Sequence, residues 1–309
     1  MCIRYRSISS CTGEKIPYTQ ETPRGVAYSA RGFFCFPCNY KLKEMIKLVP
    51  KLHQRFIDNA IEVFKSDPRI MGVAAGGSYI YREMDEFSDI DFVIAVSPEY
   101  TQQVTEERRC IAQRLGNLLT SFTGEHVGEP RLLVCLYGPP LLHVDLKFVS
   151  LDDLGHKVED PEVLWERDGA VSERLKLSEA KYPMPDMQWM EDRFWAWTHY
   201  TAAKIGRGEL FEAIGAVTFL RENVIGPLAL MKKGKLPRGV RKIETDAPEY
   251  AALLKETAAG YDTESCIKAI NIILRLYEQL RESLADGSLI RRREAEEYSK
   301  AYLDAISER

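Results

Sequence analysis

Two polar motifs separated by ten residues decide the fold of this chain: Gly76-Gly77-Ser78 and Asp89-Ile90-Asp91-Phe92. The first motif follows an apolar run over residues 70–75, and the second opens another over residues 90–96. Short apolar runs bounded by turn residues are typical of buried β-strands. We therefore predict a strand that ends at the glycine turn and a second strand that begins at the aspartates.

The two aspartates of the second motif are predicted to share one side of their strand. Side chains alternate along a strand, so Asp89 and Asp91 point one way while Ile90 and Phe92 point into the core. Ionised carboxylates this close repel each other and are costly unless they are paired or bound to a cation. Mg²⁺ takes one or two carboxylates together with substrate phosphates, which makes it the cation we expect here.

A third carboxylate belongs to His143-Val144-Asp145-Leu146-Lys147-Phe148, in which polar and apolar residues alternate as in a half-buried strand. If this strand neighbours the strand over residues 90–96, Asp145 joins the other two aspartates. The glycines of the first motif leave backbone N–H groups open to an anion, and the Ser78 hydroxyl is a further donor. The turn at Gly77 and Ser78 is thus a candidate phosphate-binding site.

The rest of the chain fits an α+β protein in which a small mixed β-sheet domain, flanked by helices, is followed by a C-terminal helical bundle. Helical spacing of apolar residues covers 45–66, a long helix is expected over about 99–122, and Gly138-Pro139-Pro140 predicts a hairpin turn between strands 132–137 and 141–149. After a polar stretch, five segments carry helical periodicity: 187–205, 210–231, 248–259, 264–284 and 293–306. We expect four parts: an irregular N-terminal extension (1–44), a catalytic domain (45–150), a connecting region (151–185) and a helical substrate-binding domain (186–309).

Composition narrows the class of protein. A chain of 309 residues with 45% hydrophobic and 28% charged residues is long enough for two globular domains. The formal net charge of −4 gives no electrostatic reason to expect a nucleic-acid partner. No uninterrupted apolar run reaches the ~18 residues of a membrane-spanning helix, so we expect a cytoplasmic protein that does not enter a membrane. Residues 1–44 are expected to be a tail, or an extension upstream of a start at Met45.

The combination of these motifs resembles the DNA polymerase β-like nucleotidyltransferase superfamily. The resemblance covers residues 70–149 and rests on Gly77-Ser78, the ten-residue gap, Asp89-x-Asp91 and the later strand residue Asp145. A small catalytic domain followed by a helical bundle is similar in layout to the antibiotic-modifying members, the aminoglycoside and lincosamide nucleotidyltransferases. Residues 193–210 are also similar to their bundle helices.

The resemblance implies an Mg²⁺-dependent enzyme that transfers a nucleoside monophosphate, AMP from ATP or another triphosphate, to an acceptor hydroxyl and releases pyrophosphate. Asp89 and Asp91 would hold two Mg²⁺ ions, and Gly77 and Ser78 would hold the β- and γ-phosphates. Asp145 would complete the second metal site or accept the proton of the acceptor. The acceptor would be a small molecule, with aminoglycoside-like antibiotics, and hence antibiotic resistance, among the candidates.

Several interpretations stay open at the level of sequence. Lys204 is a candidate phosphate ligand, as a bundle lysine is in related enzymes, although a lysine at a helix end is also explained by the helix dipole. His143 and His199 are better explained as structural residues than as catalysts. Two alternatives to a small-molecule nucleotidyltransferase stay open. The chain could be an enzyme that nucleotidylates a partner protein, or a non-catalytic nucleotide-binding module of the antitoxin type.

Overall fold

The computed structural model describes residues 49–308. The chain divides into two compact units, the first ending at Lys181 and the second beginning at Tyr182. The predicted N-terminal extension and the first residues of the helix predicted from residue 45 lie outside the described residues.

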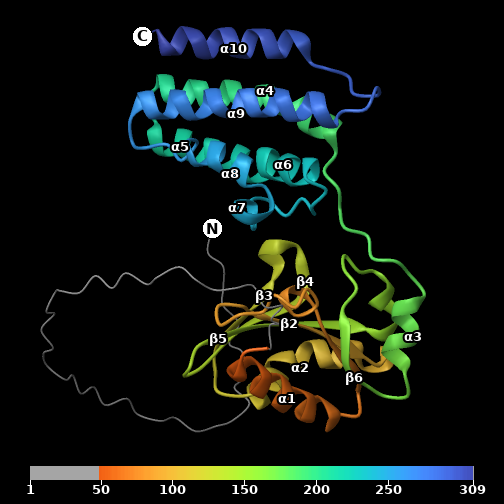
Figure 1. Ribbon diagram of the computed structural model, residues 1–309. Helices are drawn as coiled ribbons and strands as arrows, with labels where there is room; N and C mark the ends of the chain where they lie inside the picture. The colour runs from red at the N-terminus through yellow and green to blue at the C-terminus, as the bar shows by residue number, and fades with distance from the viewer. Residues whose placement is uncertain (1–48, 309) are drawn as a thin grey trace, which may run out of the picture. The chain divides into compact units, whose positions relative to one another are not determined.

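The first unit is built on a six-stranded mixed sheet, in the order β3-β4-β5-β2-β1-β6 (Figure 1). Only β2 and β5 pair in parallel; the other neighbours are antiparallel. The strands are β1 (Ile70–Ala75), β2 (Ile90–Val96), β3 (Leu118–Gly124), β4 (Glu129–Tyr137), β5 (Leu142–Ser150) and β6 (Glu162–Glu166). The predicted α+β class with a mixed sheet is confirmed.

Helices α1 (Lys51–Lys65) and α2 (Thr101–Arg114) cover one face of this sheet (Figure 1). The apolar residues of the two central strands are buried against them, including Phe92 of β2 and Leu146 of β5. Because side chains alternate along a strand, the polar residues of β2 and β5 belong to the opposite face. The predicted alternation is therefore confirmed around Asp91 and Asp145, whereas further along the same face Ala95 and Val149 pack against Leu154 and Val171.

The strands predicted over residues 70–75 and 90–96 have the expected bounds, and β4 and β5 form the expected antiparallel hairpin. The helix predicted over residues 99–122 is wrong in its second half. Helix α2 ends at Arg114, and after Gly116 and Asn117 the chain enters β3, which pairs with β4. Thr and Phe residues in β3 favour a strand, and the backbone hydrogen bonds of β4 select it over a helix.

Residues 151–181, expected to connect two domains, instead contribute structure to the first unit. Strand β6 pairs with β1 and extends the sheet, and helix α3 (Ala170–Lys176) packs beside both strands. Strand β6 has only five residues, and its three apolar residues, Val163, Leu164 and Trp165, form a run too short to distinguish a strand from a turn of helix. Its partner β1 lies about ninety residues earlier, and this pairing supplies the stability that the local sequence does not show.

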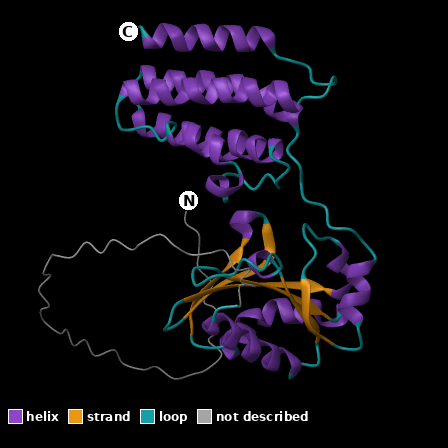
Figure 2. Cartoon of the chain, in the orientation of Figure 1, coloured by secondary structure: helices purple, strands orange, loops and turns teal. Residues whose placement is uncertain are grey.

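The second unit consists of helices (Figure 2). They are α4 (Met187–Gly206), α5 (Leu210–Leu220), a π-helical turn (Arg221–Ile225), α6 (Gly226–Lys232), α7 (Ile243–Asp246), α8 (Pro248–Lys255), α9 (Thr263–Leu284) and α10 (Arg293–Ser307). Asp186 caps α4 by accepting hydrogen bonds from the backbone N–H groups of Gln188 and Trp189. The five predicted helical segments are all helical, and the second unit has its own hydrophobic core.

One helical run, Leu210–Lys232, is long and apolar enough to cross a membrane by length and composition. Half of its most apolar window is buried inside the protein, where residues such as Val217, Leu220 and Leu228 pack in the core of the second unit. Buried core helices of this kind share the composition of membrane spans. We interpret the run as part of the hydrophobic core of the second unit.

Candidate active site

The parallel pairing of β2 with β5 brings two of the predicted site residues together. Asp91 and Asp145 are direct partners in the register of these strands. Register partners in a sheet point to the same face, so both carboxylates belong to the face that α1 and α2 leave uncovered. The strands are therefore neighbours, which is the condition on which the predicted three-carboxylate site depends.

The pKa of Asp145 reflects burial and the charges of two nearby residues, Asp89 and His143. Burial raises the pKa of the Asp145 carboxyl above its usual value, and the negative charge of Asp89 raises it further. His143, whose Nε2 lies 3.0 Å from Asp145 Oδ1, acts in the opposite direction. Added positive charge beside the Asp145 carboxylate would therefore be stabilising.

The glycine turn packs directly against Asp91. Gly76 donates its backbone N–H to the Asp91 carbonyl at 2.9 Å, and Gly77 has a left-handed backbone with φ of +56°. A Cβ atom at Gly77 would lie 2.0 Å from Asp91 Oδ2, closer than any two such atoms can approach. Glycine is therefore required at position 77 for two reasons, the backbone conformation and the space occupied by the carboxylate.

Two polar groups of this turn differ in their partners. Ser78 Oγ is buried and, within the described residues, has no hydrogen-bond partner. A buried hydroxyl without a partner is unfavourable, so an acceptor placed beside Ser78 Oγ would be stabilising. The Gly77 backbone N–H instead donates to Glu159 Oε1 at 2.8 Å. Glu159 was not predicted from the sequence, since a single glutamate in a polar segment carries no recognisable signal.

The residues at this face suit a magnesium–phosphate site in donor type. Within residues 49–308, no group of three or more His, Cys, Asp or Glu side chains is arranged to hold a metal ion on its own. Mg²⁺ bound with a nucleotide needs only one or two carboxylates, because phosphate oxygens and water supply its other ligands. Asp91 and Asp145 on adjacent strands, together with the unpartnered Ser78 hydroxyl, meet that smaller requirement.

Strands β4 and β5 also carry an ion pair, formed by Glu129 and by Lys147, which is near Asp145 in sequence. Lys147 Nζ of β5 lies 2.8 Å from Glu129 Oε2 at the start of β4. The pKa of Glu129 is lowered to about 2, mainly because Arg131 donates to its carboxylate, with Lys147 adding to the effect. Glu129 is held ionised by two cations and so is an ion-pair residue of the sheet.

A buried histidine holds the loop that precedes Asp89. His53 of α1 is 2% exposed, and its Nε2 lies 2.7 Å from the Ser88 carbonyl oxygen. This contact links the helix to the residue immediately before Asp89. The position of the first aspartate is thereby set from the core side of the sheet, a role that the helical periodicity of residues 45–66 did not reveal.

Lys204, the remaining predicted site residue, belongs to the second unit at the end of α4. Its ammonium group forms an ion pair with Glu209 and lies 3.8 Å from Glu212 Oε2 and 5.2 Å from the centre of the Tyr200 ring. Hydrogen bonding to Glu209 raises the pKa of Lys204. Contact with a phosphate would require this ion pair to open.

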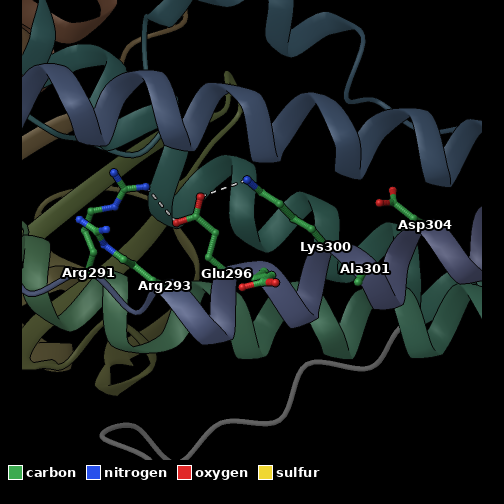
Figure 3. Close-up of a pocket in the computed structure, with 7 residues that line it drawn as sticks. Arg291, Arg293, Glu296, Lys300, Ala301 and Asp304 are labelled. Carbon is green, nitrogen blue, oxygen red and sulfur yellow. Dashed lines mark hydrogen bonds and ion pairs between the residues drawn. The ribbon is translucent and has the colours of Figure 1, made fainter.

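The second unit also has a pocket of about 550 Å³ along α10, lined by Arg291, Arg293, Glu296, Glu297, Lys300, Ala301 and Asp304 (Figure 3). Glu296 lies between Arg291, at 3.2 Å, and Lys300, at 3.0 Å. The charges of this pocket therefore largely neutralise one another. None of the predicted site residues lines it.

Two solved structures are similar to this chain. An aminoglycoside 6-adenyltransferase from Bacillus subtilis matches with a TM-score of 0.37 and 15% identity, over 82% of this chain and 98% of the other. A nucleotidyltransferase-like protein from Exiguobacterium sibiricum matches with a TM-score of 0.34 and 15% identity, over 83% of this chain and 80% of the other. No protein-family model and no curated protein matches the chain.

Proposed function

We propose that this protein is an Mg²⁺-dependent nucleotidyltransferase that moves AMP from ATP to a hydroxyl of a small-molecule acceptor and releases pyrophosphate. The observation that carries the proposal is the direct register of Asp91 with Asp145 on the sheet face opposite α1 and α2, together with the glycine turn against Asp91. Paired carboxylates next to the unpartnered Ser78 hydroxyl suit the binding of a metal–triphosphate complex.

Asp89, Asp91 and Asp145 would hold the magnesium ions. Bound Mg²⁺ neutralises the charge of the triphosphate and makes the acceptor hydroxyl easier to deprotonate. The Ser78 hydroxyl and the Gly77 N–H would donate to the β- and γ-phosphates and so fix the direction of the leaving pyrophosphate. Lys204 stays a predicted phosphate ligand.

In the proposed reaction the acceptor oxygen forms a bond to the α-phosphorus, while the bond from that phosphorus to the bridging oxygen of the β-phosphate breaks. The proton of the acceptor hydroxyl passes to a carboxylate, and pyrophosphate leaves with the electron pair of the broken bond. Asp145 suits the role of proton acceptor, because burial and the charge of Asp89 raise the pKa of its carboxyl. As acceptor class we propose aminoglycoside-like antibiotics, on the layout resemblance described above.

The test measures pyrophosphate release for a panel of triphosphates and acceptors, together with melting temperatures with and without Mg²⁺ and ATP. We expect Asp89→Asn and Asp91→Asn to abolish pyrophosphate release and the Mg²⁺-dependent stabilisation by ATP. Both variants should leave the metal-free melting temperature equal or higher, since each removes a repelling charge. Glu86→Gln, an exposed carboxylate in the preceding loop, is the control and should behave as wild type.

A purely structural role for the aspartates predicts the opposite pattern. The metal-free melting temperature of the variants would fall, and any remaining activity would follow the fraction of folded protein. That result would end the proposal.

A further inference from the structure

Glu159 lies on the phosphate-binding face of the glycine turn, although it is distant from the turn in sequence. It belongs to the segment between β5 and β6, and its Oε1 accepts the Gly77 N–H at 2.8 Å. A Cβ atom added at Gly76 would also lie 2.8 Å from this same oxygen. The carboxylate therefore rests against two consecutive residues that have no side chain, in the space which the glycines leave open.

The Gly77 N–H is the donor that the proposed function assigns to the triphosphate. Carboxylate and phosphate oxygens are both anionic acceptors, and backbone N–H groups at a left-handed glycine bind either of them. One N–H cannot donate fully to both. The Asp91 carboxylate also lies against Gly77, so a triphosphate that joined Glu159 at this donor would add a third anionic group to the same place.

We propose that Glu159 is an internal competitor of the triphosphate: it occupies the Gly77 N–H in the nucleotide-free protein and is displaced when the phosphates bind. This inference rests on the proposed function. The segment that carries Glu159 joins two strands of the sheet, so its carboxylate can leave the glycine turn without opening a strand pair.

Competition of this kind lowers the apparent affinity for the ligand by the fraction of protein in which the donor is free. The effect is selective, because only a ligand that places phosphate oxygens at Gly77 meets the competitor. In the proposed arrangement, the β- and γ-phosphates of the nucleotide place their oxygens at Gly77. A nucleoside monophosphate lacks both of these phosphates, so its affinity should not depend on Glu159.

The experiment compares full-length wild type with Glu159→Ala and Glu159→Gln by isothermal titration calorimetry. The probes are an ATP analogue with a methylene between the α- and β-phosphates, inorganic tripolyphosphate, and AMP, each with Mg²⁺. Asp160→Ala and Asp160→Asn are matched controls: Asp160 is the next residue, is exposed, and lies 2.6 Å from Lys157 instead of the turn.

We expect Glu159→Ala to bind the ATP analogue and tripolyphosphate about tenfold more tightly, the size of one charge-assisted hydrogen bond. Glu159→Gln, which keeps an acceptor oxygen but loses the charge, should fall between Glu159→Ala and wild type. Affinity for AMP should stay unchanged in both variants, and the Asp160 variants should match wild type with every probe.

Equal or weaker binding of the ATP analogue by both Glu159 variants would overturn the inference and make Glu159 a support of the turn or a metal-site residue. An equal gain in the Asp160 variants would also overturn it, because the effect would then be a general loss of negative charge. If wild type binds the ATP analogue and either of these two results is obtained, the inference about Glu159 is wrong while the proposed function is unaffected. Failure of every form to bind any triphosphate would overturn both.

Discussion

At the scale of single residues, the candidate site depends on one glycine. The contact of Gly77 with Asp91 leaves no room for any side chain, and the left-handed backbone adds a second constraint. Gly128 provides a comparison in the same unit, since its φ of +74° is similar and a Cβ atom there would meet nothing within 4 Å. Substitutions at Gly77 and at Gly128 therefore separate two losses of stability: one caused by the left-handed backbone, and one caused by displacing the Asp91 carboxylate.

We expect Gly77→Ala and Gly128→Ala each to lose roughly 1–2 kcal/mol of stability from the left-handed backbone alone. Only Gly77→Ala should also lose Mg²⁺-dependent ATP binding, because its methyl group displaces the Asp91 carboxylate. Urea unfolding and calorimetry on both variants check this. Retained ATP affinity in Gly77→Ala would show that the Asp91 position is not needed for the nucleotide.

At the scale of elements, one buried carboxylate joins α1, β1 and α2. Asp67, at the end of α1, is 5% exposed and accepts hydrogen bonds from Arg69, which precedes β1, and from Arg114, the last residue of α2. Arg69 also lies 2.7 Å from Glu107 of α2. These contacts hold the two helices at their positions under the sheet.

The pKa of Asp67 is lowered to about 2 from the ordinary value of 3.8, chiefly because Arg69 donates to its carboxylate. A lowered pKa contributes stability that is present above pH 3.8 and is lost as the pH falls through about 2. We expect Asp67→Asn to cost about 2 kcal/mol at pH 7 and progressively less between pH 4 and pH 2.

Urea unfolding of the full chain across this pH range measures the difference. Asp58→Asn, which changes an exposed carboxylate of α1, is the control and should stay within about 0.5 kcal/mol of wild type. A difference between Asp67→Asn and wild type that does not vary with pH would mean that the ion pairs of Asp67 are not its source.

At the scale of the whole molecule, each of the two units has a hydrophobic core of its own. The core of the second unit is formed by residues from Met190 to Ile306. Its buried carboxylate, Glu191, also finds its partners within the unit: Tyr277 donates to it at 2.7 Å, and Arg281 lies 3.2 Å away. A unit that has its own hydrophobic core and pairs its buried carboxylate internally should not need the first unit to fold.

We expect residues 182–309, produced alone, to be helical by circular dichroism and to unfold in one cooperative transition. ATP with Mg²⁺ should not change its melting temperature, since the three aspartates belong to the first unit. A fragment that unfolds without cooperativity, or that binds a dye specific for exposed apolar surface, would contradict the independence of the second unit.

Much of the architecture could be predicted from the sequence because it depends on local patterns. The alternation in β2 and β5, the glycine turn, the hairpin at Gly138 and the helical periodicity after residue 185 follow from side-chain spacing over a few residues, which backbone geometry dictates. The same spacing predicts that Asp89 and Asp91 share one side of their strand; β2 begins at Ile90, directly after Asp89.

Other features depend on residues that meet only after folding. Strands β3 and β6 are short, and the backbone hydrogen bonds that β4 and β1 supply to them decide their structure more than their own sequences do. Two contacts of the candidate site join segments more than fifty residues apart. They are the register of Asp91 with Asp145 and the hydrogen bond from the Gly77 N–H to Glu159. Contacts of this kind cannot be predicted from the spacing of residues in a single sequence, because they depend on the free energy of the whole folded sheet.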